Sequence, residues 1–409
     1  MYYKRTLEPR LRALAGMYSC VLVTGIRQAG KTELVRHSFP GHEWVLLDRA
    51  GIVSEARSDP ALFLRNHPPP CIFDEVQRVP ELFLELKDLI DQNNPGRGEI
   101  ILTGSQPLQM MKEVSESLAG RVGILELSGM TPSELRADEQ TPNSLAEWLQ
   151  SPPVGRRFPW PLPPADMVFR GGFPRMVLAE HSPDDATVAQ RLSDYIQTFL
   201  TRDLRDLAEI SDLGRFERFL RFVANTSARL LNVEALARDS GIPQGTIHDW
   251  LSVLEAAFVI RRIPGYSRQV TKREVKRPKL ILCDSGLLLH LLGFRASDLA
   301  RESPSFGAAF ETLCAHALFA LLSREGIRPP VYHWRSGERD EVDFVVELTS
   351  DMTIPIECKL TGQPSAADAQ GIQRFLQIHG AKGPGVVISA QEDCFWLTPN
   401  VLHIPLSAL

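Results

Sequence analysis

The residues with the most defined chemistry lie at positions 25–32, where the sequence GIRQAGKT fits the pattern G-x-x-x-x-G-K-[ST]. An apolar run precedes this stretch and a helix-compatible segment follows it. This order of strand, glycine loop and helix directs backbone N–H groups and a helix N-terminus at one point, where a phosphate group binds. The predicted nucleotide contacts within the loop are Gly25, Arg27, Gln28, Ala29, Gly30, Lys31 and Thr32.

Two side chains of this loop indicate ATP with Mg²⁺ as the cofactors. Lys31 is long enough to reach the β- and γ-phosphates, and Thr32 offers its hydroxyl to the metal ion. Gly25 and Gly30 let the backbone turn tightly around the phosphate oxygens.

A pair of acidic residues follows about 40 positions later, where the apolar run at 71–73 ends in Asp74 and Glu75. Carboxylates at the carboxyl end of a buried strand are typical of a Walker B position. Asp74 would hold the Mg²⁺, directly or through water, and Glu75 would polarise the attacking water as a general base. We therefore expect a triphosphate to be hydrolysed here.

Two further positions extend the predicted site. If the apolar run 100–103 is a parallel neighbour of the first strand, Thr103 or Ser105 reaches the same crevice and senses the γ-phosphate; the alternative is an ordinary Gly-Ser turn. Arg121 is a candidate arginine finger for the transferred phosphoryl group, and the alternative is a surface charge. A finger acting in trans implies a ring or a dimer, whereas in cis a monomer suffices.

Continuous apolar runs alternate with helix-like stretches through the first part of the chain. Such runs indicate a parallel sheet covered by helices on both faces, which is the α/β architecture of a P-loop NTPase. The runs span residues 20–24, 43–47, 70–74, 99–103 and 122–127.

The segments GIRQAGKTEL, CIFDEVQRVPELF, IILTGSQ and SLAGR, in this order, resemble the AAA+ ATPases of bacteria and archaea that carry a C-terminal domain of unknown function. The resemblance covers essentially the whole chain. It implies that Lys31 and Thr32 contact nucleotide and metal, that Asp74 and Glu75 form Walker B, and that Ser105 is the sensor.

The sequence departs from that family at two positions. Ile26 stands where proline is usual, and Glu33 follows Thr32 where a hydroxyl residue is common. A carboxylate that pointed at the phosphates would lower nucleotide affinity, whereas one that points outward would not.

Composition places limits on the class of protein. The chain has 409 residues, 44% hydrophobic and 23% charged, with a net charge of −5, as in an ordinary globular protein of two or three domains. No apolar run approaches the ~18 residues of a membrane span, and the N-terminus is too charged for a signal peptide, so we expect a cytoplasmic protein. The six cysteines form no CxxC or Cys/His cluster, which argues against a structural zinc site.

The segment 151–165, SPPVGRRFPWPLPPA, holds six prolines without periodicity and predicts a linker or an extended strap. It separates the ATPase part from the rest. The predicted divisions are an ATPase domain at 1–135, a Pro-rich linker at 136–165, a helical and winged-helix domain at 166–285 and a nuclease-like domain at 286–409.

Residues 215–283 predict a winged helix. Two helices joined by a turn at Gly241 give a helix-turn-helix, and two strands enclose a basic loop as the wing. Between Arg261 and Lys279 there are eight Lys or Arg and one Glu, a possible phosphate-contacting footprint. The predicted recognition helix is not basic, and Asp249 within it would repel phosphates. The basic loop thus makes DNA the expected partner, through contact with its backbone rather than recognition of its sequence, and packing or assembly is the alternative role.

A second acidic set lies near the C-terminus. Two strands, 341–348 and 354–360, would form a hairpin that brings Asp343 close to Glu357, and Lys359 shares the face of Glu357. Carboxylates can hold Mg²⁺ or Mn²⁺, and a lysine can activate water.

This arrangement resembles the restriction-endonuclease-like fold with its PD-(D/E)xK motif. The resemblance implies that Asp343 and Glu357 are metal ligands, that Lys359 is catalytic and that Glu311 is the accessory acid on a helix. The alternatives are a solvated strand with alternating charge, or a nuclease-like fold that binds without cutting.

Together these features predict a Mg²⁺-dependent AAA+ ATPase that acts on DNA through a winged helix and a possible endonuclease domain. The alternative is an ATP-controlled switch protein whose nuclease-like domain recognises a partner or DNA without cleavage.

Overall fold

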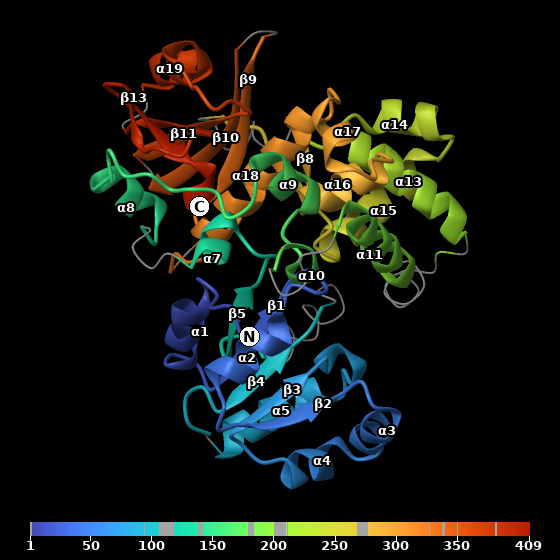
Figure 1. The fold of residues 1–409 in the computed structure, drawn as a ribbon. Helices are drawn as coiled ribbons and strands as arrows, with labels where there is room; N and C mark the ends of the chain where they lie inside the picture. Colours follow the sequence, from blue (N-terminus) through green and yellow to red (C-terminus); the bar gives the residue numbers. More distant parts are fainter. Residues whose placement is uncertain are drawn as a thin grey trace. The chain divides into compact units, whose positions relative to one another are not determined.

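The computed structural model describes residues 2–93, 95–105, 118–137, 142–178, 184–199, 210, 212–267, 277–326, 328–337, 340–349, 351–380 and 383–409 (Figure 1). The chain divides into two compact units, the first made chiefly of residues up to Gly129 and the second of residues from Met130 onward. No helix among the described residues is long and apolar enough to cross a membrane.

The first unit contains a five-stranded sheet in the order β2-β3-β4-β1-β5, with every described pair parallel. The five predicted apolar runs all form strands, which confirms the parallel α/β sheet and makes β4 a neighbour of β1. The strands are β1 (Cys20–Thr24), β2 (Glu43–Leu46), β3 (Cys71–Asp74), β4 (Ile100–Thr103) and β5 (Val122–Glu126).

Helices and buried apolar side chains accompany this sheet. Leu22, Phe73 and Leu102 of three adjacent strands are each fully buried and share one core cluster with Phe63 and Phe83. Because the strands are apolar throughout, polar groups concentrate at the strand ends. The helices are α1 (Glu8–Ala15), α2 (Lys31–Ser38), α3 (Ala50–Ser58), α4 (Pro60–Asn66), the 3-10 helix η1 (Val76–Arg78) and α5 (Leu82–Asn93).

The second unit begins with helices and a small antiparallel sheet of order β6-β8-β7. Its elements are α7 (Pro132–Arg136), α8 (Leu145–Gln150), α9 (Pro164–Arg170), α10 (Pro174–Val177), α11 (Asp185–Thr198), α13 (Leu213–Thr226), β6 (Arg229–Leu230), α14 (Val233–Ser240), α15 (Gln244–Ala256), β7 (Ile260–Ile263), β8 (Lys279–Leu282), α16 (Ser285–Leu291) and α17 (Ser297–Arg301). Residues 268–276, which hold most of the predicted basic wing, and residues 200–209 lie outside the described residues.

The unit continues with a six-stranded mixed sheet of order β13-β14-β12-β11-β10-β9. Strands β10 and β11 form the predicted antiparallel hairpin, since Phe344 pairs with Ile356 and the next step along the register sets Asp343 opposite Glu357. The elements are α18 (Phe306–Leu322), β9 (Val331–Ser336), β10 (Asp340–Thr349), β11 (Met352–Lys359), the 3-10 helix η5 (Ala366–Ala369), α19 (Gln370–His379), β12 (Gly385–Ser389), β13 (Phe395–Thr398), β14 (Val401–Pro405) and η6 (Leu406–Ala408).

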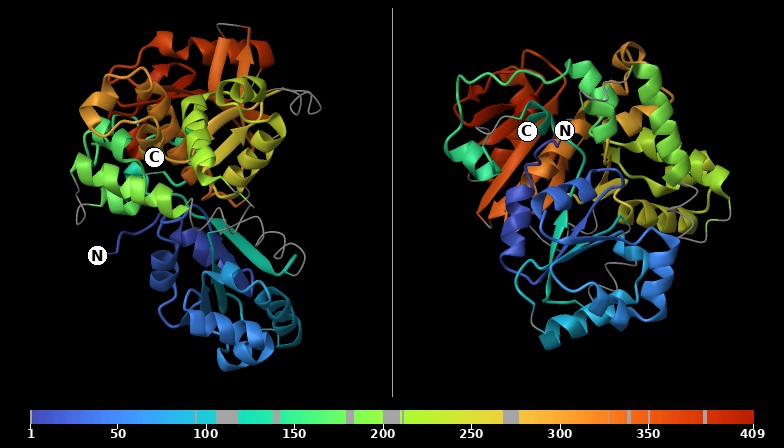
Figure 2. Two further views of the ribbon diagram at one scale, coloured as in Figure 1. Left: turned by 90° about the vertical axis from the view of Figure 1, so that its right-hand side faces the viewer. Right: turned by 60° about the horizontal axis from the view of Figure 1, so that its bottom comes forward.

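The Pro-rich segment is a strap rather than a free linker. It runs along the C-terminal sheet of the same unit (Figure 2), where the Phe158 N–H donates to the Glu392 carbonyl at 2.7 Å and the Trp160 indole donates to the Ala390 carbonyl at 2.9 Å. The Ser407 hydroxyl donates to the Phe158 carbonyl at 2.5 Å. Proline suits such a path because it needs no partner for a backbone N–H.

The turn at residues 169–174 is explained by close packing in the second unit. The Gly172 N–H donates to Asp284 Oδ2 at 2.7 Å. A Cβ on Gly171 would lie 2.3 Å from Asp284 Oδ1, and Gly171 has a φ of +73°. The approach of the Asp284 carboxylate therefore requires glycine at position 171.

Candidate functional site

The glycine loop of the first unit adopts the conformation that its residue types predict. It joins the end of β1 to the start of α2, and its glycines Gly25 and Gly30 have φ of +131° and +96°. A Cβ at position 25 would lie 2.1 Å from the Leu127 carbonyl oxygen. Because larger residues would be strained and would clash there, the loop depends on glycine, as a cradle for phosphate does.

Lys31, at the start of α2, folds back over this loop. The residue is 7% exposed, and its ammonium donates to the Gly25 carbonyl at 3.0 Å and to the Ile26 carbonyl at 2.9 Å. These acceptors are neutral, and a phosphate oxygen makes a stronger, charge-assisted hydrogen bond. The position of the ammonium at the mouth of the loop fits a bound phosphate.

Thr32 and Asp74 meet at the carboxyl end of the sheet. The Thr32 hydroxyl lies 3.0 Å from Asp74 Oδ2 and 3.1 Å from Oδ1. Asp74 is 2% exposed and also accepts hydrogen bonds from Thr103 and from the Trp44 indole, the latter at 3.3 Å. A hydroxyl and a carboxylate held side by side beside a phosphate loop fit Mg²⁺, which takes a few protein oxygens together with phosphate oxygens.

Glu75 is held in an uncommon backbone conformation, with a φ of +63°. Gln77 donates from Nε2 to Glu75 Oε2 at 2.5 Å and to the Ser105 hydroxyl at 3.4 Å. The Glu75 N–H donates to the Thr103 hydroxyl at 3.3 Å. Strained residues of this kind gather at active sites when their surroundings fix them, as these three contacts do.

Gln77 was not among the predicted site residues, although it belongs to the segment CIFDEVQR. Its position two residues after Glu75 could have indicated in the sequence that it contacts the site. The two sensor candidates contact different partners, because Thr103 touches Asp74 whereas Ser105 touches Gln77.

A second residue outside the predicted set, Arg5, fastens the loop to the rest of the first unit. It is 4% exposed and donates to the Ala29 carbonyl, to the Ser128 carbonyl and to the Gly129 carbonyl, each at 2.8 Å. The lysine-arginine pair near the N-terminus was the available signal. The contact ties the loop to the chain that follows β5.

The structure does not bring Arg121 to this site. Arg121 precedes β5, whose first residue, Val122, pairs with Cys20 at the start of β1. The phosphate loop follows the other end of β1, and five residues at about 3.3 Å each separate the two edges by about 15 Å. Arg121 instead forms a two-pronged ion pair with Asp91, at 2.6 and 2.8 Å. Arg121 therefore lies at the end of the sheet opposite the loop.

Glu33, the departure beside the loop, points away from it. Its side chain is 63% exposed and lies 3.7 Å from His37 Nδ1 on the next turn of α2. The carboxylate therefore adds no repulsion at the phosphate position.

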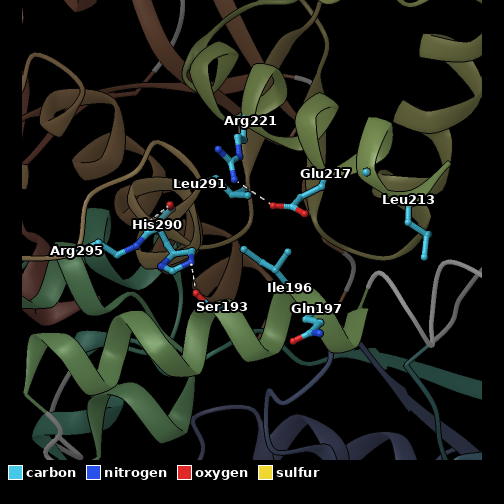
Figure 3. A pocket seen from close by; sticks show the side chains of 10 residues that line it. Ser193, Ile196, Gln197, Leu213, Glu217, Arg221, His290, Leu291 and Arg295 are labelled. Carbon is cyan, nitrogen blue, oxygen red and sulfur yellow. Dashed lines mark hydrogen bonds and ion pairs between the residues drawn. The ribbon is translucent and has the colours of Figure 1, made fainter.

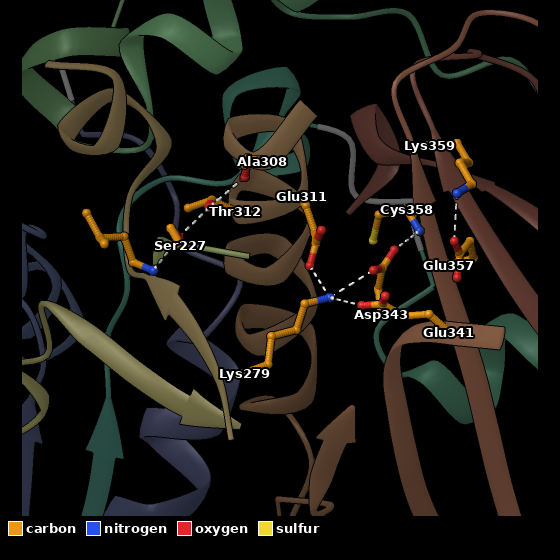
Figure 4. A network of polar contacts seen from close by, with 11 residues as sticks. Ser227, Lys279, Ala308, Glu311, Thr312, Glu341, Asp343, Glu357, Cys358 and Lys359 are labelled. Atoms are coloured by element: carbon orange, nitrogen blue, oxygen red, sulfur yellow. Dashed lines mark hydrogen bonds and ion pairs between the residues drawn. The ribbon is translucent and has the colours of Figure 1, made fainter. Parts of the chain in front are cut away.

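The C-terminal acidic residues come together as the hairpin prediction requires. Asp343 accepts a hydrogen bond from the Cys358 N–H at 2.9 Å, which fastens β10 to β11 beside Glu357 (Figure 4). Glu357 lies 2.7 Å from the Lys359 ammonium, and Glu311 faces this group from α18.

A lysine that was not predicted to belong to this group lies at its centre. Lys279, the first residue of β8, is 1% exposed, and its ammonium lies 2.5 Å from Glu311 Oε1 and 2.8 Å from Asp343 Oδ1. Glu341 Oε1 is 3.8 Å away. A lysine that begins an otherwise apolar strand was the available signal. Among the described residues, no three His, Cys, Asp or Glu are arranged to hold a metal ion.

The charges of this group are unbalanced. Burial by itself lowers the pKa of Lys279, but the carboxylates of Asp343 and Glu311 outweigh that effect and raise the pKa above its ordinary value. Burial, together with the Asp343 charge, raises the pKa of both Glu311 and Glu357. The single positive charge of one deeply buried ammonium thus lies near more carboxylates than it can neutralise.

The basic stretch between positions 261 and 279 is partly used inside the second unit. The Arg262 guanidinium pairs with Glu255 at 2.7 Å, and the Arg261 guanidinium lies 4.8 Å from the Phe319 ring centroid. Because Lys279 is buried, it contributes nothing to a surface footprint. The count of eight basic residues therefore overestimates the positive charge that this stretch presents to a ligand.

A hollow of about 410 Å³ lies elsewhere in the second unit, among α11, α13 and α16 (Figure 3). Its polar contacts join its own walls, because the Ser193 hydroxyl lies 3.1 Å from His290 Nε2 and Arg221 pairs with Glu217 at 3.1 Å. None of the predicted site residues lines it.

Comparisons with known proteins match three segments of the chain. A family described as an AAA domain matches residues 18–136, a domain of unknown function (DUF8612) matches residues 165–298, and another domain of unknown function (DUF4143) matches residues 306–409. The AAA match and the loop geometry together make the N-terminal part an ATPase domain that binds ATP.

Two relatives and one solved structure are similar to larger parts of the chain. The uncharacterized proteins Rv2008c of Mycobacterium tuberculosis and Mb2031c of Mycobacterium bovis are each 32% identical over 404 residues, which cover 98% of this chain and 83% of the relative. The Walker-type ATPase PABY2304 of Pyrococcus abyssi is 16% identical, with a TM-score of 0.45 over 71% of this chain and 96% of that one. The chain is therefore a member of the same family as Rv2008c, with an AAA-type P-loop ATPase domain followed by a domain of unknown function (DUF4143).

Proposed function

We propose that this chain is a Mg²⁺-dependent ATPase whose hydrolytic site is formed by Lys31, Thr32, Asp74 and Glu75. The observation that carries the proposal is the contact of the Thr32 hydroxyl with Asp74 at 3.0 Å, directly beside the glycine loop. These two residues would hold Mg²⁺, which supplies positive charge to the β- and γ-phosphates.

The residues around the phosphates have separate tasks in this reaction. Lys31 and the backbone N–H groups of residues 25–32 bind the phosphates and stabilise the charge that develops on them. Glu75 orients the attacking water and accepts its proton. Gln77 holds the Glu75 carboxylate through the contact at 2.5 Å, and the strained backbone at Glu75 keeps that carboxylate in one direction.

The Glu75→Gln variant tests the general base. We expect the variant to bind ATP with Mg²⁺ and to retain it unhydrolysed, because glutamine keeps the shape of the side chain but cannot accept the proton. Bound nucleotide is measured after rapid gel filtration, and released phosphate is measured in the same sample. Turnover at the wild-type rate would contradict the role of Glu75.

We further propose that the second unit contacts DNA. The order of α13, β6, α14, α15, β7 and β8, with an antiparallel sheet of order β6-β8-β7, supports a winged helix at residues 215–283, within a helical and winged-helix domain at 166–285. The proposed nuclease-like domain follows at 286–409. ATP turnover measured with and without duplex or single-stranded DNA tests this partner. Stimulation by DNA supports it, and unchanged turnover together with no DNA retention on a filter opposes it.

An oligomer is part of the proposal only if Arg121 acts on a neighbouring chain, since it lies at the sheet edge opposite its own loop. ATP turnover per chain would then fall on dilution. Turnover that stays constant over a wide dilution range opposes a finger in trans.

A second function for the C-terminal domain, recognition of DNA or a partner without cleavage, is favoured by one observation. The Lys279 ammonium lies 2.8 Å from Oδ1 of Asp343, which is one of the two carboxylates that would hold the metal ion of a nuclease. Incubation of plasmid and single-stranded DNA with Mg²⁺ or Mn²⁺, with the wild type and Asp343→Ala in parallel, separates the two functions. Cleavage that disappears in Asp343→Ala supports a nuclease.

A further inference from the structure

The backbone of Lys279 lies in the three-stranded sheet, whereas its ammonium contacts residues of α18 and β10. Its strand, β8, pairs with β6 and β7, and Lys279 itself pairs with Leu230 and Ile263. The side chain leaves that sheet and ends between Glu311 of α18 and Asp343 of β10 (Figure 4). The side chain of Lys279 therefore links the three-stranded sheet to α18 and to β10 of the six-stranded sheet.

The geometry leaves no room for a divalent cation between these carboxylates. Asp343 Oδ1 accepts from the Lys279 ammonium at 2.8 Å, and Oδ2 accepts from the Cys358 N–H at 2.9 Å. The ammonium also lies 2.5 Å from Glu311 Oε1. Mg²⁺ would have to lie about 2.1 Å from the same oxygens, in the space that the ammonium fills. Glu311 and Asp343 therefore do not fit a metal ion between them while Lys279 keeps this position.

We propose that the Lys279 ammonium is a built-in substitute for the metal ion of the nuclease-like fold, so that the carboxylate group of Glu311 and Asp343 binds no divalent cation. The proposal rests on the nuclease-like assignment made above and concerns one metal position of that domain, the one between Glu311 and Asp343. It gives the charge of Lys279 the role that a bound cation has in a nuclease, which is to hold two carboxylates together in a buried place.

The surroundings of Lys279 make this contact a fixed part of the second unit. Its strand is buried along its whole length, and a second polar link joins the same layers, because the Ser227 hydroxyl lies 3.2 Å from the Thr312 hydroxyl of α18. The Leu282 N–H donates to that Ser227 hydroxyl at 3.0 Å. If Lys279 moved out of this position, the apolar strand β8 would become exposed and the carboxylates of Glu311 and Asp343 would lose their buried partner. Both changes raise the free energy of the folded protein.

Lys359, the other lysine of this group, differs from Lys279 in its exposure and in its position. Lys359 pairs with Glu357 at 2.7 Å, but its side chain is 39% exposed and lies at the edge of the group. Its removal opens no position between Glu311 and Asp343. The variant Lys359→Met is therefore the control for Lys279→Met, since both replace an ammonium by an apolar chain of similar length.

The experiment measures Mn²⁺ binding to the full chain without nucleotide, by paramagnetic resonance of free Mn²⁺. All proteins carry Asp74→Asn, which removes the metal position of the ATPase site. We expect Lys279→Met to bind one Mn²⁺ per chain and to unfold at a higher temperature when Mn²⁺ is added. The background protein and Lys359→Met should do neither, and Asp343→Asn should abolish the binding gained by Lys279→Met.

Two results would overturn the proposal. One is Mn²⁺ binding by the background protein that Asp343→Asn removes, a comparison that needs no change at Lys279. The other is a folded Lys279→Met protein that binds no Mn²⁺. If Lys279→Met does not fold even with Mn²⁺ present, the first comparison decides. Phosphate release by Lys279→Met with Asp74 intact tests the ATPase proposal separately, because the substitution leaves that site unchanged.

Discussion

Each unit of this protein buries a lysine ammonium, but the two ammoniums have different partners. Lys31 donates to the neutral carbonyls of Gly25 and Ile26. Lys279 lies between the carboxylates of Glu311 and Asp343. A phosphate outcompetes a carbonyl for an ammonium, whereas a metal ion must displace an ammonium from two charged partners.

The partners of each ammonium decide whether the site stays open to a ligand. At the glycine loop the chain supplies the cation, and the ligand supplies the anion. In the C-terminal group the chain supplies both the ammonium and the carboxylates, so the position between Glu311 and Asp343 already holds a cation. A lysine thus leaves the glycine loop open to an anionic ligand, whereas in the C-terminal group a lysine already pairs with carboxylates of the chain.

The largest effect is expected from Lys31→Ala. Removal of the ammonium takes away the charge that stabilises the phosphates in the transition state, so ATP turnover should fall by about 1,000-fold or more. Phosphate release is measured, and circular dichroism checks the fold. Normal turnover by a folded Lys31→Ala protein would contradict the ATPase assignment. Lys359→Met, which also removes a lysine, should leave turnover unchanged.

The second effect concerns stability. Asp343→Asn leaves the buried Lys279 with one fewer carboxylate and should lower the free energy of unfolding of the second unit by about 3 kcal/mol. Glu357→Gln removes the partner of a half-exposed lysine and should cost less than about 1 kcal/mol. Hydrogen exchange of the backbone amides of α18 in increasing urea measures both. Equal losses would mean that Lys279 is not more tightly coupled to its partners than Lys359.

A smaller effect is expected from Gln77→Ala. Gln77 positions Glu75 without touching the phosphates, so its loss should reduce kcat about tenfold and leave KM for ATP nearly unchanged. Steady-state phosphate release gives both constants. Gln77→Glu is the matched variant, because it keeps the length of the side chain but places a second carboxylate against Glu75. A rise in KM without a fall in kcat would assign Gln77 to nucleotide binding instead.

The smallest effect is a pH dependence of stability. Burial and the Asp343 charge raise the pKa of Glu311 from 4.5 to about 8, so the folded state holds a proton that the unfolded state has lost in this interval. Stability from this group is complete below about pH 4.5 and is lost as the pH rises through about 8. Wild-type protein should therefore lose more stability over this range than Glu311→Gln. The exposed control Glu302→Gln should follow the wild type, and parallel pH profiles for Glu311→Gln and the wild type would contradict the prediction.

The ATPase site could largely be predicted from the sequence because its determinants are local. Gly25, Lys31 and Thr32 are contiguous or nearly so, and Asp74 ends a strand whose apolar pattern is plain. The position of Arg121 could also have been predicted, because it directly precedes a strand that the sequence predicts to run parallel to the one before the loop. The parallel pairing of β1 with β5 sets the start of that strand opposite the loop.

The C-terminal group shows the opposite balance. The hairpin and the closeness of Asp343 to Glu357 follow from strand periodicity, and the structure confirms both. The role of Lys279 does not follow, since it is 64 positions from Asp343 in sequence and is joined to it only by packing between two layers. Its neighbours in sequence suggested a basic surface loop, whereas burial of β8 gives it an interior partner.

The most direct test combines both sites in one preparation of the full chain with Mg²⁺ or Mn²⁺, assayed for ATP turnover and for cleavage of plasmid and single-stranded DNA. Lys31→Ala and Asp343→Ala proteins, purified identically, serve as references. We expect ATP turnover that Lys31→Ala abolishes, and no DNA cleavage that depends on Asp343. DNA cleavage by the wild type that disappears in Asp343→Ala would show that Lys279 does not close the C-terminal site, and would contradict the account.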